Sequence, residues 1–227
     1  SRGSGDKCGH FVQKCDPNDG HIVWTRKLSC GPGDTDALGI CATSGAVYFA
    51  ERDSHLEVPG YPDFGYKYDF VHKYDADGNE LWERVVGLRG GYTQDICADA
   101  SGVYVTGCTS DAFIRKFDAE GNEVWTRLFG SEAGEWAYDI SLYSGSIYVA
   151  GCTWGVLPGQ TGRGGGDVFV CRYDTDGNQV WVQQVGSGLE DDTVALSVSA
   201  GGIYLGGRTR GAMPGCSSQG GYDAYLG

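Results

Sequence analysis

The fold of this chain is decided by the stretch Asp111-Ala-Phe-Ile-Arg-Lys-Phe-Asp118, which recurs along the sequence. Asp167-Val-Phe-Val-Cys-Arg-Tyr-Asp174 repeats it, Tyr68 to Asp75 matches it, and Gly9 to Asp16 matches it loosely. Asp223-Ala-Tyr225 begins the same pattern a fifth time. Within the stretch, alternate residues share a face, as expected of a β-strand. The sequence therefore indicates a repeat protein built from strands.

Each copy is followed by a turn rich in Asp, Asn and Gly, and then by a strand with one tryptophan in register. Three turns have the same length: Asp75-Ala-Asp-Gly-Asn79, Asp118-Ala-Glu-Gly-Asn122 and Asp174-Thr-Asp-Gly-Asn178. The first, Asp16-Pro-Asn-Asp-Gly20, is one residue longer. We interpret the tryptophans as anchors that pack one repeat on the next; they are Trp24, Trp82, Trp125 and Trp181.

Two more strands complete each unit. One is apolar, around Ile40, Ile96, Ile140 and Leu196, and the other carries Tyr48, Tyr104, Tyr148 and Tyr204. Hairpin turns such as Ser101-Gly102 separate the two strands. Four-stranded units of this length predict an all-β fold, a β-propeller made of four-stranded antiparallel blades, with four repeats plus the first strand of a fifth.

The predicted organisation is a single β-propeller, or a segment of one, over residues 1–227. The repeats cover approximately 9–67, 68–110, 111–166 and 167–222, with a partial fifth at 223–227. The Ile strand is expected to be innermost and the Trp strand outermost. Pairing the two ends would close a four-bladed ring, but residues 223–227 would then duplicate the strand supplied by 9–16. Either the polypeptide continues into a larger ring, which we favour, or the tail pairs with a neighbouring chain.

The pattern Asp-Ala-Phe-x-x-Lys-Phe/Tyr-Asp-x-x-Gly-Asn-x-x-Trp, followed by Tyr-Val-x-Gly-x-Thr, resembles the SBBP family of bacterial β-propeller repeats. The likeness covers nearly the whole chain and is strongest in the two middle copies. It is weakest in the first, where Cys15 replaces the aromatic residue and Glu51-Arg52 replaces the Gly-x-Thr ending. The resemblance implies a secreted or surface-associated setting, and it implies no catalytic residues.

Composition narrows the classes of partner. The net charge of −13 argues against nucleic acid, which is held mainly by Lys and Arg. No apolar stretch approaches the ~18 residues of a membrane span. Nine cysteines favour an extracellular or other oxidising compartment.

Two sets of acidic residues are candidate cation sites. The turns resemble calcium loops only weakly, and ordinary turn chemistry explains them better, so no cofactor is assigned. Their calcium candidates are Asp75, Asp77, Asp118, Glu120, Asp174 and Asp176. A second set is expected to form an acidic rim near the ring axis, either a solvated surface or a site for a cation or basic partner. This rim comprises Asp34, Asp36, Glu132, Glu135, Glu190, Asp191 and Asp192.

The cysteines offer two disulfide hypotheses. Cys152 and Cys171 lie on strands expected to be neighbours, and they form either a cross-strand disulfide or two buried thiols. Four more cysteines crowd the first repeat and could staple the open end of the chain in any of three pairings. These are Cys8, Cys15, Cys30 and Cys41.

The sequence contains no catalytic constellation that stands out from the repeat. It favours a non-enzymatic scaffold or protein-interaction module that meets a protein partner or assembles with itself. The alternative is a propeller that binds glycans or cations through its acidic loops and through loop aromatics such as Tyr61, Trp136 and Trp154.

Overall fold

The computed structural model describes residues 10–28, 35–53, 68–86, 91–218 and 220–227. Within these ranges every regular element is a β-strand, and no helix is present, so none of the described residues could cross a membrane as a helix. The strands form five antiparallel sheets in which each strand pairs with the next strand of the chain.

The sheets follow the order of the sequence. The N-terminal hairpin contains β1 (Phe11–Cys15) and β2 (Ile22–Lys27). The first sheet contains β3 (Thr35–Ala42), β4 (Ala46–Asp53), β5 (Tyr68–Asp75) and β6 (Glu80–Val85). The second contains β7 (Tyr92–Asp99), β8 (Gly102–Cys108), β9 (Ala112–Phe117) and β10 (Glu123–Phe129). The third contains β11 (Glu135–Tyr143), β12 (Ser146–Thr153), β13 (Asp167–Asp174) and β14 (Gln179–Val185), and the C-terminal sheet contains β15 (Asp191–Ser199), β16 (Gly202–Thr209) and β17 (Asp223–Leu226).

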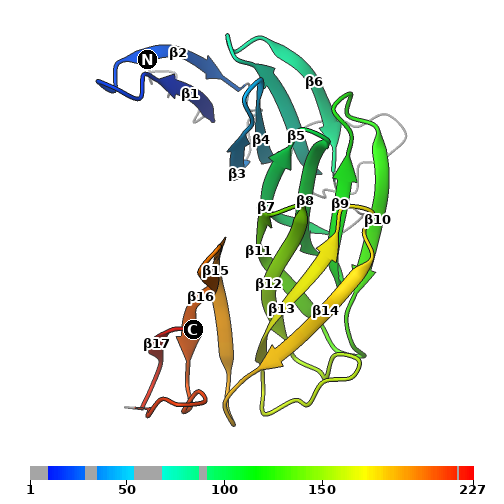
Figure 1. Ribbon diagram of the computed structural model, residues 1–227, viewed down its shortest axis with the longest axis vertical. Helices are drawn as coiled ribbons and strands as arrows, with labels where there is room; N and C mark the ends of the chain where they lie inside the picture. Colours follow the sequence, from blue (N-terminus) through cyan, green and yellow to red (C-terminus); the bar gives the residue numbers. More distant parts are fainter. Residues whose placement is uncertain (1–9, 29–34, 54–67, 87–90, 219) are drawn as a thin grey trace, which may run out of the picture.

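The sheets stand side by side along an arc (Figure 1). Neighbouring sheets touch through their Ile strands, since β3 contacts β7, β7 contacts β11, and β11 contacts β15. The Trp strands β6, β10 and β14 form the opposite edges. The Ile and Trp strands therefore lie at opposite edges of each four-stranded sheet. Neither β1 nor β2 pairs with β17, and the described strands do not close a ring.

Sequence repeats and sheets are out of phase by half a unit. The repeat at residues 68–110 supplies β5 and β6 to the first sheet and β7 and β8 to the second. Every full repeat is therefore shared between two sheets. The chain passes from one sheet to the next in the middle of a repeat.

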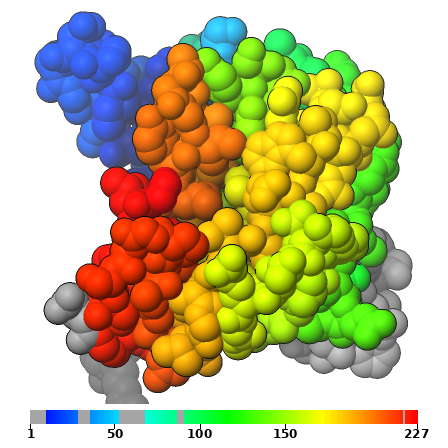
Figure 2. All heavy atoms as spheres, turned by 60° about the horizontal axis from the view of Figure 1, so that its bottom comes forward, coloured from blue at the N-terminus to red at the C-terminus, as the bar shows by residue number. Residues whose placement is uncertain are grey.

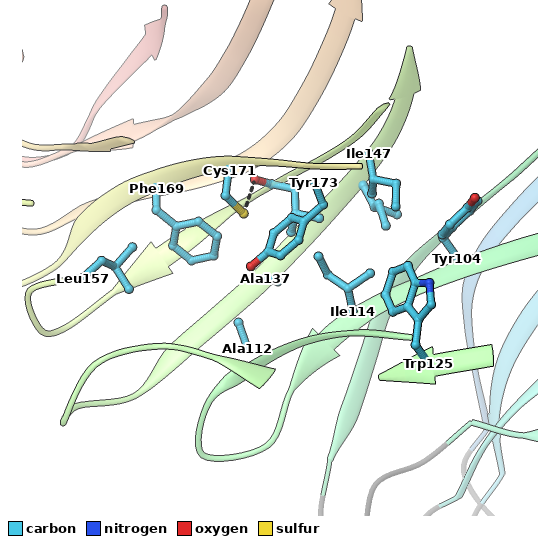
Figure 3. Packing of buried hydrophobic residues seen from close by; sticks show 12 residues of the cluster. Tyr104, Ala112, Ile114, Trp125, Ala137, Ile147, Leu157, Phe169, Cys171 and Tyr173 are labelled. Atoms are coloured by element: carbon cyan, nitrogen blue, oxygen red, sulfur yellow. Dashed lines mark hydrogen bonds between the residues drawn. The ribbon is translucent and has the colours of Figure 1, made fainter. Parts of the chain in front are cut away.

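The hydrophobic core is divided among the joints between sheets. Both faces of β9 are buried: Phe113 and Phe117 pack toward the first sheet, while Ala112 and Ile114 pack toward the third. Figure 3 shows the second of these layers, in which Ile114 lies among residues that include Phe169. Burying one such side chain contributes about 1.5–3 kcal/mol, so apolar contact between sheets is a major source of stability.

Candidate functional site

The most regular polar feature of the molecule joins each sheet to the next. The indole Nε1 of Trp82 on β6 donates to the carbonyl oxygen of Ala119 at 3.0 Å, and Lys73 Nζ donates to the same oxygen at 2.7 Å. Arg84 Nε donates to the carbonyl oxygen of Gly121 at 2.8 Å. Ala119 and Gly121 lie in the acidic turn between β9 and β10, in the second sheet. We call this set of one Lys, one Trp and one Arg on one sheet, and the acidic turn that accepts from them, the clasp.

The clasp occurs at two further joints. The tryptophans donate from Trp24 to Ala76 at 3.0 Å and from Trp125 to Thr175 at 3.2 Å. The arginines donate from Arg26 to Gly78 and from Arg127 to Gly177. The lysines donate from Lys14 to Ala76 and from Lys116 to Thr175. All acceptors are backbone carbonyls, so the clasp recognises the conformation of the turn rather than its side chains.

The acidic turn is shaped by its own side chains. The carboxylate of Asp118 accepts hydrogen bonds from the backbone N–H of Glu120 at 3.0 Å, from the backbone N–H of Asn122 at 2.8 Å and from the Asn122 side-chain amide. These bonds, the Asn122 side chain first, hold the pKa of Asp118 below its usual value. Gly121 has a left-handed φ of +80°. A Cβ there would lie 2.9 Å from the Trp82 ring, so only glycine fits beneath the indole.

This arrangement bears on the predicted calcium candidates. Asp75 and Asp174 accept from Asn79 and Asn178 as Asp118 does from Asn122. The other three candidates, Asp77, Glu120 and Asp176, are exposed. Among the described residues, none of these three turns brings three ligand groups within reach of one ion. The repeated aspartates therefore stabilise the conformation of the turns. The geometry of these turns does not support a calcium site.

A second link between sheets lies near the inner strands. Asp95 accepts from the backbone N–H of Ile140 at 3.2 Å, and Asp139 accepts from that of Leu196 at 2.7 Å. Each aspartate sits at a β-bulge. Burial, followed by the proximity of Asp139, raises the pKa of Asp95 to about 7. Neither aspartate was predicted from the sequence, although each directly precedes the Ile of its strand.

The predicted acidic rim divides into two groups. Glu135 and Asp191 are buried: Glu135 accepts from Thr153 Oγ1 at 2.8 Å, and Asp191 accepts from Ser187 Oγ at 3.0 Å. These two carboxylates tie loops to strands and do not face solvent, which corrects the expectation for them.

The remaining rim residues are more accessible. Asp36, Glu132 and Glu190 are exposed and Asp192 is half-buried, while Asp34 lies outside the described residues. Arg210 pairs with Glu190 at 2.9 Å, and Arg208 pairs with Asp192 at 3.1 Å. Part of the acidic charge is therefore balanced within the chain.

The cross-strand disulfide that was one of two alternatives for Cys152 and Cys171 does not form. In the β12–β13 register, Cys152 lies opposite Val168 and Cys171 lies opposite Val149. Cys171 Sγ is 3.6 Å from the carbonyl oxygen of Val149 (dashed in Figure 3). Burial raises the pKa values of both thiols. The structure thus gives the other outcome that the sequence left open, two buried thiols.

The predicted staple of the first repeat is described only in part. Cys15 is exposed and Cys41 is partly buried, and neither forms a disulfide. Cys8 and Cys30 lie outside the described residues.

Exposed aromatic rings gather where β11 begins and β12 ends. Trp136 and Trp154 are 39% and 49% exposed, and their ring centroids are 6.2 Å apart in an edge-to-face arrangement. Tyr138 lies 6.0 Å from Trp136 on the same strand. Tyr61, the third predicted aromatic, lies outside the described residues. Two adjacent exposed indoles form an amphipathic surface of the kind that planar or sugar ligands contact.

The clasp is half complete at each end of the array. Trp181 on β14 packs edge-to-face against Tyr148 with ring centroids 6.2 Å apart, much as Trp125 packs at a tilt against Tyr104. The Trp181 N–H nevertheless has no hydrogen-bond partner in the described part of the chain. At the other end, Gly20 has a φ of +76°, and no atom lies within 4 Å of the position where its Cβ would be. In Figure 2 the N-terminal hairpin (blue) projects at one corner of the molecule.

Comparisons with known proteins give the fold and little more. No family model matches the chain. A stretch of 64 residues is 41% identical to the regulatory protein FlaEY of Caulobacter vibrioides, and it covers 26% of this chain but only 7% of that protein. The chain therefore corresponds to a small part of the length of that relative.

The fold is similar to that of a crystal structure of a protein of unknown function from Bacteroides caccae. The TM-score is 0.52 at 14% sequence identity, covering 90% of this chain and 67% of the other. The likeness supports the all-β architecture alone. Neither protein carries the name of an enzyme.

Proposed function

We propose that this chain is a non-enzymatic scaffold, a segment of β-propeller blades that joins further blades through its two open half-clasps. The observation that carries the proposal is the clasp itself. The recurring Lys, Trp and Arg side chains hold neighbouring sheets together at three joints. A chain organised in this way is specialised for assembly.

The two ends are complementary. The C-terminal side offers Trp181 as a donor, with Arg172 on β13 in the position that Lys116 occupies in the second sheet. The N-terminal side offers the turn Asp16–Gly20, in which Gly20 has nearly the φ of Gly121. The edge of β16 that the β1–β2 hairpin of a second copy would need is paired with β17, so docking of the Asp16–Gly20 turn next to Trp181 requires that β17 be displaced. Gln183 replaces the usual arginine, and its amide can still donate to a carbonyl.

Self-association of the full chain tests the proposal by sedimentation velocity over a wide range of concentration. We expect a concentration-dependent, head-to-tail assembly that Trp181→Ala and Gly20→Ala both abolish. Val180→Ala removes an exposed apolar side chain from the same strand and serves as the control for Trp181. Gly145→Ala is matched to Gly20→Ala, because Gly145 also has a left-handed φ, +71°, and an open Cβ position.

Each other outcome counts against the proposal. If the chain stays monomeric at every concentration, the hypothesis that it self-assembles through the half-clasps is rejected. Assembly that survives both Trp181→Ala and Gly20→Ala places the contact elsewhere.

The exposed pair Trp136 and Trp154 favours a second candidate function, glycan binding. Indole faces stack on the apolar face of sugar rings, and these two rings lie at the loop end of the third sheet. A glycan array probed with the wild-type chain and with Trp154→Ala tests it. Binding that Trp154→Ala removes and Trp181→Ala leaves intact would favour this function, and a blank array would reject it.

An extracellular setting belongs to the same proposal. It rests on the resemblance to secreted propeller repeats and on the number of cysteines, nine, and not on any disulfide, because the seven described cysteines are free thiols. Labelling of the protein on intact source cells by a membrane-impermeant reagent tests it. Labelling only after lysis would contradict it.

A further inference from the structure

A chain of histidines and glutamates is built into the first sheet, on the face that the N-terminal hairpin covers. His72 on β5 is only 4% exposed. Its Nε2 lies 3.1 Å from Glu51 Oε1, and the other oxygen of Glu51 lies 3.1 Å from His10 Nδ1. On the opposite side of the ring, His72 Nδ1 lies 3.0 Å from Glu80 Oε1 and 3.7 Å from Glu83 Oε2.

A β-bulge brings the two outer carboxylates to the same ring nitrogen. Residues 80 and 83 are an odd number of positions apart, so on a regular strand their side chains would point to opposite faces. The pairing of β5 with β6 shifts register between Lys73 and Tyr74 of β5: His72 pairs with Glu83, while Tyr74 pairs with Glu80. The extra residue lets both glutamates reach His72.

The corresponding position in the second sheet holds a permanent cation. Arg115 replaces His72 there; its Nε donates to Thr126 Oγ1 at 2.8 Å, and its Nη1 lies 3.8 Å from Glu123. Glu123 and Thr126 correspond to Glu80 and Glu83. Glu51 also has no acidic counterpart, because Gly107 occupies the corresponding position. The first sheet thus has two carboxylates more and no guanidinium at the position of His72, and this excess of negative charge favours a bound cation.

We propose that His72 Nδ1, Glu80 and Glu83 bind a divalent transition-metal ion, with zinc as the reference ion. Three ligand atoms, one from each residue, lie within 4.8 Å of one another. Around a tetrahedral zinc ion with bonds of about 2.0–2.1 Å, neighbouring ligand atoms are about 3.3 Å apart, between the two separations found from His72 Nδ1. Both glutamates are about half exposed, which leaves an entry path and room for water as a further ligand.

Glu51 prepares the histidine for this role. When Nε2 carries the proton and donates it to Glu51, the lone pair of Nδ1 faces the two glutamates, as in the carboxylate–histidine–metal arrangement of many metal sites. His10 in turn positions Glu51. Glu51 is therefore a positioning residue and not a ligand.

A second observation points to an additional polar group at the cluster. Tyr74 is 2% exposed, its ring stacks on that of His72 at 6.2 Å, and its buried hydroxyl has no hydrogen-bond partner among the described residues. Water on the bound ion could donate a hydrogen bond to this hydroxyl.

The proposal is tested with zinc alone by calorimetric titration of the full chain, and with cobalt by absorption. We expect one ion per chain and a tetrahedral cobalt spectrum. Glu83→Gln and Glu80→Gln, at half-exposed positions where the fold should persist, each weaken binding at least tenfold. Glu51→Gln weakens it about 10- to 100-fold by releasing the ring.

Matched controls separate this cluster from other ligands. Asp19→Asn alters the exposed group formed by Asp16, Asp19 and His21, and it leaves binding unchanged. Three results would overturn the proposal: no zinc binding, binding that survives Glu80→Gln and Glu83→Gln, or the strong charge-transfer absorption of cobalt bound to a thiolate. A ring nitrogen spectrum that shows His72 doubly protonated with zinc present would assign the cluster to an imidazolium ion pair instead. None of these readouts depends on self-association, so the two proposals fail separately.

Discussion

The indole N–H of Trp82 donates to the carbonyl oxygen of Ala119, 3.0 Å away in the next sheet. The two residues are 37 positions apart in sequence, and the same relationship links Trp24 to Ala76 and Trp125 to Thr175. One side chain therefore reports whether two neighbouring sheets are docked. This makes the tryptophans the natural sites at which to measure the strength of a joint.

Replacement of Trp82 by Phe keeps an aromatic ring and removes the donor. We expect the free energy of unfolding to fall by about 1 kcal/mol for the lost hydrogen bond, with some further loss of packing. Trp181→Phe makes the same chemical change where the N–H has no partner, and the expected effect is limited to the loss of packing. Urea denaturation measures both, and equal losses would show that the hydrogen bond does not stabilise the joint.

Replacement of Gly121 by Ala tests the close approach of the turn to the indole. The new Cβ combines a strained φ of +80° with a contact of 2.9 Å to the Trp82 ring. A left-handed conformation alone costs about 1–2 kcal/mol, and overpacking adds about 1–3 kcal/mol. Gly145→Ala carries the first cost only, so thermal unfolding should show the larger loss for Gly121→Ala. Matching losses would mean that the ring moves away freely.

Stability should depend on pH through Asp95. Its pKa in the folded protein, about 7, is higher than the ordinary value of 3.8, so folding favours the protonated carboxyl. The contribution is present at low pH and is lost as the pH rises through about 7. Asp95→Asn keeps an acceptor for Ile140 and cannot ionise. We therefore expect the variant to gain stability relative to wild type as the pH is raised.

Thermal unfolding at a series of pH values between about 5 and 8 measures this difference. The raised pKa of His72 also makes stability fall as the pH rises. This effect is the same in wild type and in Asp95→Asn, so it does not change the difference between them. Glu132→Gln removes an exposed carboxylate and should follow the wild-type curve. Parallel curves for wild type and Asp95→Asn would contradict the prediction.

The cysteines should differ in reactivity according to burial. Cys15 and Cys216 are exposed and should be alkylated in the native protein, whereas Cys171, fully enclosed and with its pKa raised by burial, should react only on unfolding. Peptide mapping by mass spectrometry measures the order. A disulfide found between Cys152 and Cys171 would contradict the register of β12 and β13.

The repeat allowed much of the fold to be predicted, because turn residues and the alternation of strands are local properties. The positions of Trp24, Trp82 and Trp125 at the joints followed from their register in the repeat. The partners of these tryptophans did not, because a backbone carbonyl on the next sheet leaves no signature in the sequence. Asp95 and Asp139 were overlooked for a similar reason: their function depends on bulges, which are set by the packing of one sheet against another.

The two alternatives left open for Cys152 and Cys171 show a different limit. Neighbouring strands were correctly inferred for Cys152 and Cys171, but a bridge depends on register, and here the two cysteines lie opposite Val168 and Val149. The prediction of an acidic rim was wrong for Glu135 and Asp191, because these side chains point inward and accept hydrogen bonds from hydroxyl groups. Their direction depends on the conformation of the loops. The sequence pattern predicted which strands are neighbours. It did not predict the direction in which individual side chains point.

The half-unit offset between repeats and sheets has a consequence for how such a gene can change. Tandem duplication or loss of one repeat-length segment inserts or removes the second half of one sheet together with the first half of the next. Each new half meets a partner of the same kind, so every interior joint is restored with its Trp and its acidic turn. Unequal recombination can thus alter the number of units without inventing a new contact surface, because interactions in repeat arrays are confined to nearest neighbours.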